Sequence, residues 1–478
     1  MIFTQPIFLL FFAVCFLVHW ALKNHQAQKW WLLACSYYFY GYWDWRFLSL
    51  IFASTCVDFL IGLALGRQAS PAARRLIVMG SVVVNLGFLG FFKYYNFFVE
   101  SGRELLDWFG MPVAGTALHI VLPVGISFFT FQSMSYTIDV YRREIPAARS
   151  FLDFALFVSF FPQLVAGPIV RARDLLPQFT RAPVFADIEA RSCLLLFWVG
   201  FFKKACLADN IAGAIDPVFA DPSRYHGVDI VLSSLLYSVQ IYCDFSGYTD
   251  MAIATAGMLG YRLVRNFEYP YLSRNIQEFW RRWHISLSTW LRDYLYVSLG
   301  GNRGGAAKMA RNLMLTMVLG GLWHGANWTF VAWGFLHGAA LVAHRFLWGR
   351  VAGSVAPGID GTRAAPGSRA TVWGATLLTF LWVAFCFSIF RSPSLTLAIE
   401  FFGRLTAVRG AVKLNADWWL LFVAIASVHW FWSRHERAIF QRAGLLGNVP
   451  FYVGYGAACA VIPCFMSLNT APFIYFQF

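Results

Sequence analysis

The sequence of 478 residues has few charges, and this scarcity argues against a soluble protein. Only 13% of its residues are charged, while 59% are hydrophobic and 19% are aromatic. An average soluble domain has roughly 25% charged residues. Acidic residues are fewer than basic ones, which leaves a formal net charge of +14. In a membrane protein such an excess first indicates topology, so we predict no nucleic-acid partner.

Metal-ligand patterns are also missing. The 9 cysteines are scattered, with no CxxC pair and no metal-ligand spacing. No HExxH motif occurs, and no acidic residue lies between Asp293 and Asp360 to complete a site beside His324. On one continuous helix, His337 and His344 would lie on a face opposite His324 and could not share an ion with it. We therefore predict no metal and no bound cofactor.

The serine-hydrolase pattern GxSxG and internal repeats are absent as well. The segment CDFSGYTD at 243–250 places Ser246 between two acidic residues, but not on that pattern. We interpret Asp244 and Asp250 as buried hydrogen-bonding residues around a helix break. Transporters built from inverted repeats show weak symmetry between their halves, and this chain shows none.

Long apolar runs, in contrast, recur along the whole chain. A membrane-crossing helix needs about 20 mostly apolar residues. We predict an all-α, polytopic integral membrane protein, with about a dozen transmembrane or re-entrant helices around a central substrate chamber. The whole chain, 1–478, is expected to form a single membrane domain. The apolar runs are 7–22, 46–66, 76–98, 118–138, 191–209, 230–243, 311–333, 371–390, 416–433 and 451–467.

Basic residues between these runs predict the orientation. No Lys or Arg precedes the first run, whereas Lys23 and Lys29 follow it. The positive-inside rule therefore places both termini on the outer side of the membrane. It places three basic loops, 67–75, 141–149 and 345–370, in the cytoplasm.

Segment 151–170 breaks the alternation. It is long enough to cross the membrane, but Arg171 and Arg173 on its far side would then lie outside. Pro162 and Gly167 indicate that it dips in and returns. Broken helices at membrane depth need protein or a water-filled cavity around them, so this segment points to a substrate chamber.

Two histidine motifs stand out in this apolar background: FWRRWHISLSTWL at 279–291 and LGGLWHGANWTF at 319–330. Taken as one helix, the first motif places His284 on an aromatic stripe, away from Arg281. His324 lies among glycines, where backbones and substrate can approach closely. A buried neutral imidazole can act as a general base, although a single membrane histidine more often makes an interhelical hydrogen bond.

Arginines gather near the first motif, and two interpretations stay open. They can set the topology and contact lipid headgroups, or they can bind an anionic ligand. The cluster comprises Arg262, Arg265, Arg274, Arg281, Arg282, Arg292 and Arg303.

Several long blocks carry a resemblance that covers nearly the whole chain. They are FPQLVAGPIVRARDLLPQF (161–179), QIYCDFSGYTDMAI (240–253), NFEYPYLSRNIQEFWRRWHISLSTWLRDYLYVSLGGNRGG (266–305), LGGLWHGANWTFVAWGFLHG (319–338) and PFIYFQF (472–478). With its core motifs within 161–338, the sequence resembles bacterial membrane-bound O-acyltransferases of the alginate O-acetyltransferase type. The resemblance implies that His324 is the essential histidine and His284 a supporting one.

The resemblance also implies the reaction and its setting. We expect a bacterial inner-membrane enzyme that uses acetyl-CoA from the cytoplasm to O-acetylate an exported, alginate-like polysaccharide, directly or through periplasmic acetyltransferase partner proteins. Peptidoglycan, cellulose or another envelope glycan is the alternative acceptor. A transporter or flippase for a lipid-linked sugar is the alternative of another class. As candidate substrate-binding residues we name Arg281, Arg282, Trp323, Asn327 and Asn275.

Overall fold

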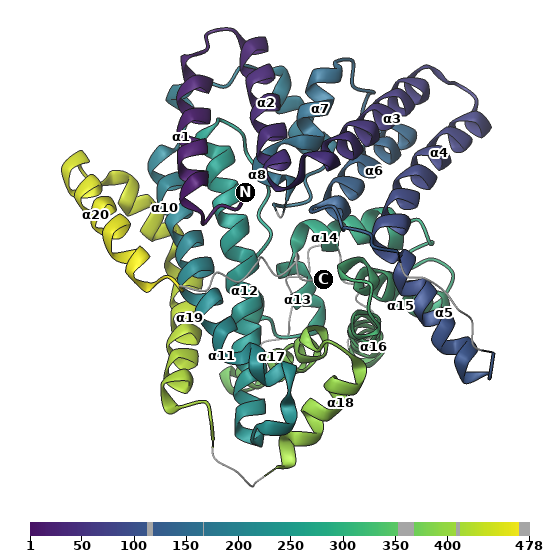
Figure 1. Cartoon of the computed structure of the whole chain (residues 1–478), viewed down its shortest axis with the longest axis vertical. Helices are drawn as coiled ribbons and strands as arrows, with labels where there is room; N and C mark the ends of the chain where they lie inside the picture. Colours follow the sequence, from purple (N-terminus) through teal and green to yellow (C-terminus); the bar gives the residue numbers. More distant parts are fainter. Residues whose placement is uncertain (112–117, 166, 352–367, 408–411, 468–478) are drawn as a thin grey trace. The chain divides into compact units, whose positions relative to one another are not determined.

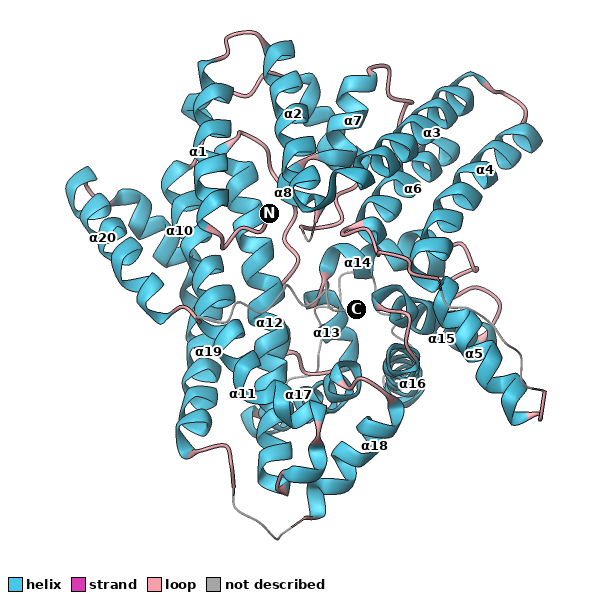
Figure 2. Ribbon diagram, in the orientation of Figure 1, coloured by secondary structure: helices cyan, strands magenta, loops and turns pink. Residues whose placement is uncertain are grey.

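The computed structural model describes residues 1–111, 118–165, 167–351, 368–407 and 412–467. Within these ranges the regular elements are helices and no strand occurs (Figure 2), which confirms the predicted all-α class. The chain divides into two compact units. The first comprises Met1–Phe201 and Gly247–Val264, and the second Phe202–Ser246 and Arg265–Phe478. A single domain over 1–478 stays a prediction.

Buried polar contacts join several helices of the first unit, whose course Figure 1 shows. Asp58 is fully buried and accepts hydrogen bonds from Ser81 Oγ (2.6 Å) and Asn85 Nδ2 (2.9 Å), which links two helices through a satisfied carboxylate. Lys29 forms a buried ion pair with Asp153 (2.6 Å). The helices are α1 (Pro6–Ala21), α2 (His25–Asp44), α3 (Leu48–Arg67), α4 (Pro71–Leu89), α5 (Tyr95–Trp108), α6 (Ile126–Arg142), α7 (Phe151–Ser159), α8 (Phe161–Leu164), α9 (Ala172–Leu175) and α10 (Ala190–Phe201).

The second unit contains both histidine motifs. Its α12 is continuous through 243–250 as far as Met258, so the predicted helix break there is wrong. Asp244 is buried, as predicted, and lies 2.5 Å from Lys204 Nζ. The helices are α11 (Asp209–Ala220), α12 (Gly227–Met258, shared with the first unit), α13 (Ile276–Arg282), α14 (Ile285–Trp290), α15 (Ala306–His324), α16 (Trp328–Val351), α17 (Arg369–Arg391), α18 (Leu395–Gly403), α19 (Ala416–Leu445) and α20 (Asn448–Val461).

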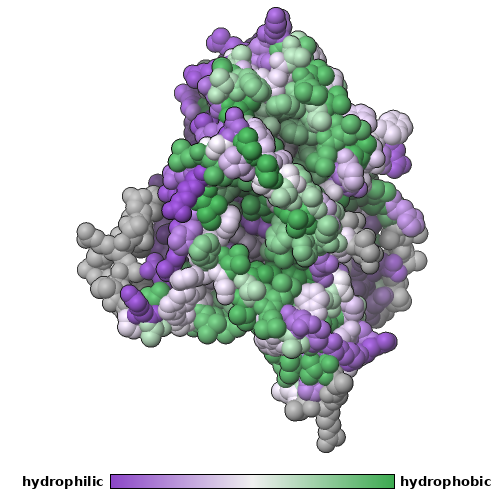
Figure 3. Space-filling model, turned by 90° about the vertical axis from the view of Figure 1, so that its left-hand side faces the viewer, coloured by the Kyte–Doolittle hydropathy of each residue, from purple (hydrophilic) through white to green (hydrophobic). Residues whose placement is uncertain are grey.

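Six helical segments in the described residues are long and apolar enough to cross a membrane. Many large apolar side chains are exposed, and Figure 3 shows hydrophobic residues over much of the visible face. Such a surface suits a multi-pass membrane protein. The number of spans is six by this measure, so the prediction of about a dozen is not confirmed. The segments are His25–Arg67, Pro71–Trp108, Gly227–Met258, Trp328–Leu347, Arg369–Arg391 and Asn448–Phe465.

Two other predicted segments differ in their bounds. Segment 151–170 is broken, as its prolines suggested: α7 ends at Ser159 and α8 has only four residues, so neither helix is long enough to cross. In the predicted loop 345–370, α16 continues to Val351 and α17 begins at Arg369. Residues 352–367 of that loop, and the block 472–478, lie outside the described residues.

Candidate active site

The first histidine motif is not one helix, contrary to the prediction. Helix α13 ends at Arg282, and α14 begins at Ile285. His284 lies between them in the left-handed region (φ 42°) and is the N-cap of α14. A periodicity argument assumes uniform helical backbone, so it could not place the side chains around such a break.

Segment 266–268 stabilises the break between α13 and α14 through backbone hydrogen bonds. The amide of Glu268 donates to the carbonyl oxygen of Arg282 (2.9 Å), and the amide of Ile285 donates to the carbonyl oxygen of Asn266 (2.9 Å). These bonds satisfy backbone groups that the interrupted helix leaves without helical partners. The left-handed conformation of His284 is thus supported from outside the motif.

The imidazole of His284 is fully buried among aromatic rings. Its centroid lies 4.6 Å from that of Phe245 and 6.1 Å from that of Trp323, both in edge-to-face geometry. Burial lowers the pKa of His284 from 6.5 to about 3, because a charged imidazolium would lose its hydration. His284 lies outside the six candidate spans and is neutral near pH 7.

His324 is the last residue of α15, at the tip of a helical hairpin. The run 311–333 was predicted as one span, but α15 ends at His324 and α16 begins at Trp328. The two helices meet backbone to backbone, since a Cβ atom on Gly321 would lie 2.2 Å from the carbonyl oxygen of Phe330. A Cβ on Gly325 would lie 2.1 Å from the Phe330 ring. The space beside Gly321 and Gly325 is therefore filled by atoms of Phe330 and is not open to substrate.

Trp323 connects the two histidines. Its ring centroid lies 6.1 Å from that of His284 and 5.1 Å from that of His324. The ring of His324 also contacts those of Trp333 (5.1 Å) and Phe390 (5.3 Å). The site is therefore an aromatic enclosure with two buried imidazoles, built from α12, the α13–α14 break, the α15–α16 hairpin and α17.

The turn at the tip of the hairpin also corrects the prediction for His337. Its ring lies 4.8 Å from Trp333, the same ring that contacts His324. The assumption of one continuous helix, which put His337 on the opposite face, is wrong. Among the described residues, no group of three or more His, Cys, Asp or Glu side chains is arranged to hold a metal ion.

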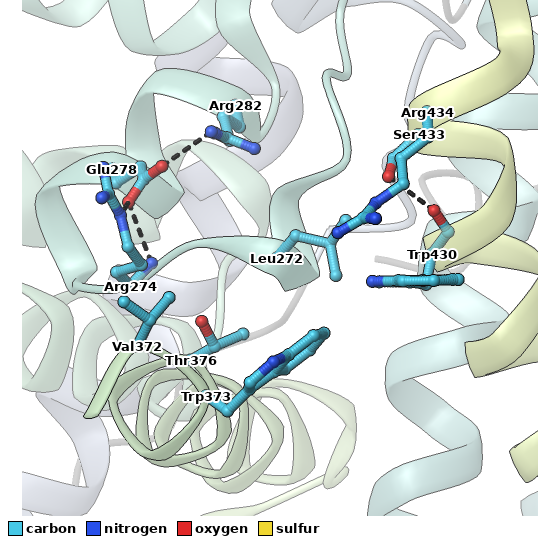
Figure 4. A pocket seen from close by; sticks show the side chains of 10 residues that line it. All are labelled: Leu272, Arg274, Glu278, Arg282, Val372, Trp373, Thr376, Trp430, Ser433 and Arg434. Carbon is cyan, nitrogen blue, oxygen red and sulfur yellow. Dashed lines mark hydrogen bonds and ion pairs between the residues drawn. The ribbon is translucent and has the colours of Figure 1, made fainter. Parts of the chain in front are cut away.

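A separate pocket of about 270 Å³ lies beside α13 (Figure 4). Glu278 forms ion pairs with both Arg274 (3.1 Å) and Arg282 (2.7 Å) on one wall. On another wall, the guanidinium of Arg434 lies over the ring of Trp430, with 4.2 Å from its carbon to the ring centroid. The full lining is Leu272, Arg274, Glu278, Arg282, Val372, Trp373, Thr376, Trp430, Ser433 and Arg434.

The sequence model of the MBOAT, membrane-bound O-acyltransferase, family matches residues 142–389, which include both histidine motifs. The chain belongs to this family. It is therefore an O-acyltransferase, and the predicted enzyme class is confirmed.

Relatives of this O-acyltransferase have several different names. The probable alginate O-acetylase AlgI of Pseudomonas aeruginosa is 46% identical over 401 residues, which cover 83% of this chain and 73% of the relative. The peptidoglycan O-acetyltransferase of Helicobacter pylori is 39% identical over 378 residues, 72% of this chain and 70% of the relative. The teichoic acid D-alanyltransferase of Bacillus subtilis is 28% identical over 291 residues, 56% of this chain and 68% of the relative.

The remaining candidate residues of the O-acyltransferase lie in different surroundings. Asn275 caps α13, because its Oδ1 accepts from the amide of Glu278 (2.8 Å). Asn327 lies just before α16, and its Oδ1 likewise accepts from an amide of the first turn, that of Thr329 (3.0 Å). Its Nδ2 donates to the carbonyl oxygen of Pro393 (2.8 Å). Both side chains thus have structural partners. Arg281 is exposed and does not line the pocket, whereas Arg282 does.

Sequence reasoning missed two parts of the site. Asn266 contacts the His284 side chain across 18 residues of chain, and no spacing rule connects them. Trp430 and Arg434 line the pocket from α19, far from either motif in sequence. An Arg four residues after a Trp on a helix was the only available signal for the latter pair.

Proposed function

We propose that this O-acyltransferase moves an acetyl group from cytoplasmic acetyl-CoA to hydroxyl groups of an exported, alginate-like polysaccharide. Five relatives named as probable alginate O-acetylases, 42–49% identical, support this acceptor. We place the enzyme in the bacterial inner membrane, with a periplasmic N-terminus. Transfer to the glycan is direct or passes through periplasmic acetyltransferase partner proteins.

One observation supports the proposed chemistry: the buried imidazoles of His284 and His324 both contact the ring of Trp323. His324 acts as the general base. It takes the proton of the acceptor hydroxyl as that oxygen attacks the thioester carbonyl. As the new C–O bond forms and the C–S bond breaks, His324 returns the proton to the departing thiolate of CoA. His284 positions the reacting groups.

The pocket beside α13 is the proposed site for the charged end of acetyl-CoA. Arg274, Arg282 and Arg434 outnumber the one carboxylate, Glu278, and therefore favour an anionic ligand. The indoles in the lining can stack on an adenine ring. With about 270 Å³ the pocket holds part of the donor, because pockets that enclose whole ligands measure roughly 300–1,000 Å³. Arg281, exposed on the same helix, is the predicted additional phosphate contact.

The test uses the purified full chain in lipid vesicles with acetyl-CoA and alginate oligosaccharides. Wild-type protein should release free CoA and form O-acetyl esters, either alone or once a periplasmic acetyltransferase partner is added, and His324→Ala should do neither. His435→Gln, a change of an exposed histidine on α19, is the matched control and should keep full activity. A wild-type protein that never consumes acetyl-CoA, while His324→Ala abolishes glycan transport, would favour the transporter instead.

Peptidoglycan is the second candidate acceptor, because a peptidoglycan O-acetyltransferase is 39% identical to this chain. In the same vesicles, peptidoglycan fragments replace the alginate oligosaccharides. A higher rate of ester formation on those fragments would reassign the acceptor and leave the proposed chemistry intact.

A further inference from the structure

Asn266 makes three contacts with three successive residues at the His284 break. Its carbonyl oxygen accepts from the amide of Ile285 (2.9 Å). Its side-chain Oδ1 accepts from the amide of Ser286 (3.1 Å) and lies 3.4 Å from Nδ1 of His284. Asn266 is 1% exposed, so these groups meet away from solvent.

The Ser286 amide fixes the orientation of the Asn266 side chain. A backbone N–H can only donate, so the atom that faces it is the amide oxygen and not the amide nitrogen. That same oxygen faces His284 Nδ1. Because an amide oxygen can only accept, Nδ1 must carry the proton for the contact to be a hydrogen bond.

The protonation state of the other ring nitrogen follows. Burial keeps His284 neutral, and a neutral imidazole carries one proton. With the proton on Nδ1, Nε2 has a lone pair and can accept a hydrogen bond but not donate one. A thioester carbonyl needs a donor, whereas an acceptor hydroxyl can donate to Nε2.

We propose that Asn266 is a positioning residue that holds His284 as the Nδ1–H tautomer, so that His284 binds a hydroxyl of the acceptor sugar and not the thioester carbonyl. The second part rests on the proposed acetyl-transfer function. The first part concerns the protein alone. Because a hydroxyl has only one proton, the hydroxyl that donates to His284 Nε2 is a neighbour of the reacting hydroxyl on the same sugar, and His324 takes the proton of the reacting one.

The tautomer is measured directly, by ¹⁵N NMR of histidine-labelled full-length protein in lipid nanodiscs. The His284 signals are assigned by their loss in His284→Gln. We expect a protonated Nδ1 and an unprotonated Nε2 in the wild type. A proton on Nε2 would overturn the proposal, whatever the enzymatic activity.

Two substitutions then test the role of Asn266. Asn266→Ala should lose the single tautomer and lower turnover roughly 10- to 100-fold, as removal of outer-shell partners of a histidine does at metal sites, with the KM for acetyl-CoA unchanged. Asn266→Asp keeps an acceptor oxygen and should keep Nδ1 protonated. Asn415→Ala, an exposed asparagine before α19, is the control and should change neither quantity.

The outcomes separate the two proposals. If Asn266→Ala keeps both the tautomer and the turnover, Asn266 has no positioning role. A rise in the KM for acetyl-CoA would mean that His284 serves the donor and would overturn the hydroxyl assignment. If the wild type shows the Nδ1–H tautomer but transfers no acetyl group, the proposed function fails while the tautomer assignment stands.

Discussion

At the residue scale, the two histidines differ in backbone and in surroundings. His324 ends α15 in regular helical geometry, with Trp333 and Phe390 against its ring. His284 has a positive φ and depends on Asn266 and Glu268 for the backbone bonds around it. The sequence singled out both residues as histidines in an apolar background, His284 beside aromatic residues and His324 among glycines, and the family resemblance implied their roles. It could not predict the tautomer of His284, because Asn266 is brought to it only by the fold.

The lowered pKa of His284 predicts a loss of stability in acid. In the unfolded chain this histidine binds a proton below about pH 6.5, whereas the folded state excludes that proton down to about pH 3. The unfolded state therefore gains stability as the pH falls, by up to about 1.4 kcal/mol per pH unit. Thermal unfolding in detergent at pH 7.5 and pH 5 measures this effect. His284→Gln should lose less stability on acidification than the wild type, and an equal loss would contradict the neutral, buried imidazole.

At the element scale, the close crossing of α15 and α16 depends on Gly321. An added Cβ would lie 2.2 Å from the Phe330 carbonyl oxygen, which is backbone and cannot move aside locally. Gly321→Ala should therefore destabilise the protein by roughly 1–3 kcal/mol, the usual cost of overpacking. Gly374→Ala in α17 meets no atom within 4 Å and is the control. Equal melting temperatures for the two variants would show that the hairpin tolerates a wider separation.

The pocket arginines come from α19 and from the segment around α13. We expect them to strengthen the binding of acetyl-CoA. Arg282→Gln and Arg434→Gln should raise the KM for acetyl-CoA more than they lower turnover at saturation. Phosphate contacts remote from the carbonyl act equally in the ground and transition states. Arg281→Gln, at the predicted additional phosphate contact, should have a similar effect. Arg437→Gln, on an exposed residue of α19, is the control. An unchanged KM together with poor membrane insertion would favour the topogenic interpretation.

A helix could be predicted from the sequence where its apolar run forms one uninterrupted helix. It could not be predicted where contacts with other segments interrupt the helix. The run 371–390 matches α17 (Arg369–Arg391) closely. The breaks at His284 and after His324 were missed, since no proline marks either of them. At 151–170 the prolines did signal a break. Helix interruptions without Pro are decided by partners such as segment 266–268, which a local pattern does not contain.

At the scale of the whole molecule, the basic loops predict which side of the membrane each faces. Single cysteines at Ser70 and Ser368, in the predicted cytoplasmic loops 67–75 and 345–370, should resist a membrane-impermeant thiol reagent added to intact cells whose outer membrane is permeabilised. The positive-inside rule places the acidic segment 100–107, on α5, outside, so Glu104→Cys should react. The background is a variant whose natural cysteines are replaced. Strong labelling at Ser70 or Ser368 would overturn the predicted topology.

The central claim is that His324 is the general base, and turnover of His324→Gln beside His284→Gln tests it most directly. Glutamine keeps approximate size and hydrogen-bonding ability but cannot take a proton at neutral pH. With both variants folded and able to bind acetyl-CoA, His324→Gln should lose acetyl transfer almost completely, by roughly 10²–10⁴-fold or more, while His284→Gln keeps a measurable part. The reverse order would exchange the two roles, and high activity in both variants would contradict the mechanism.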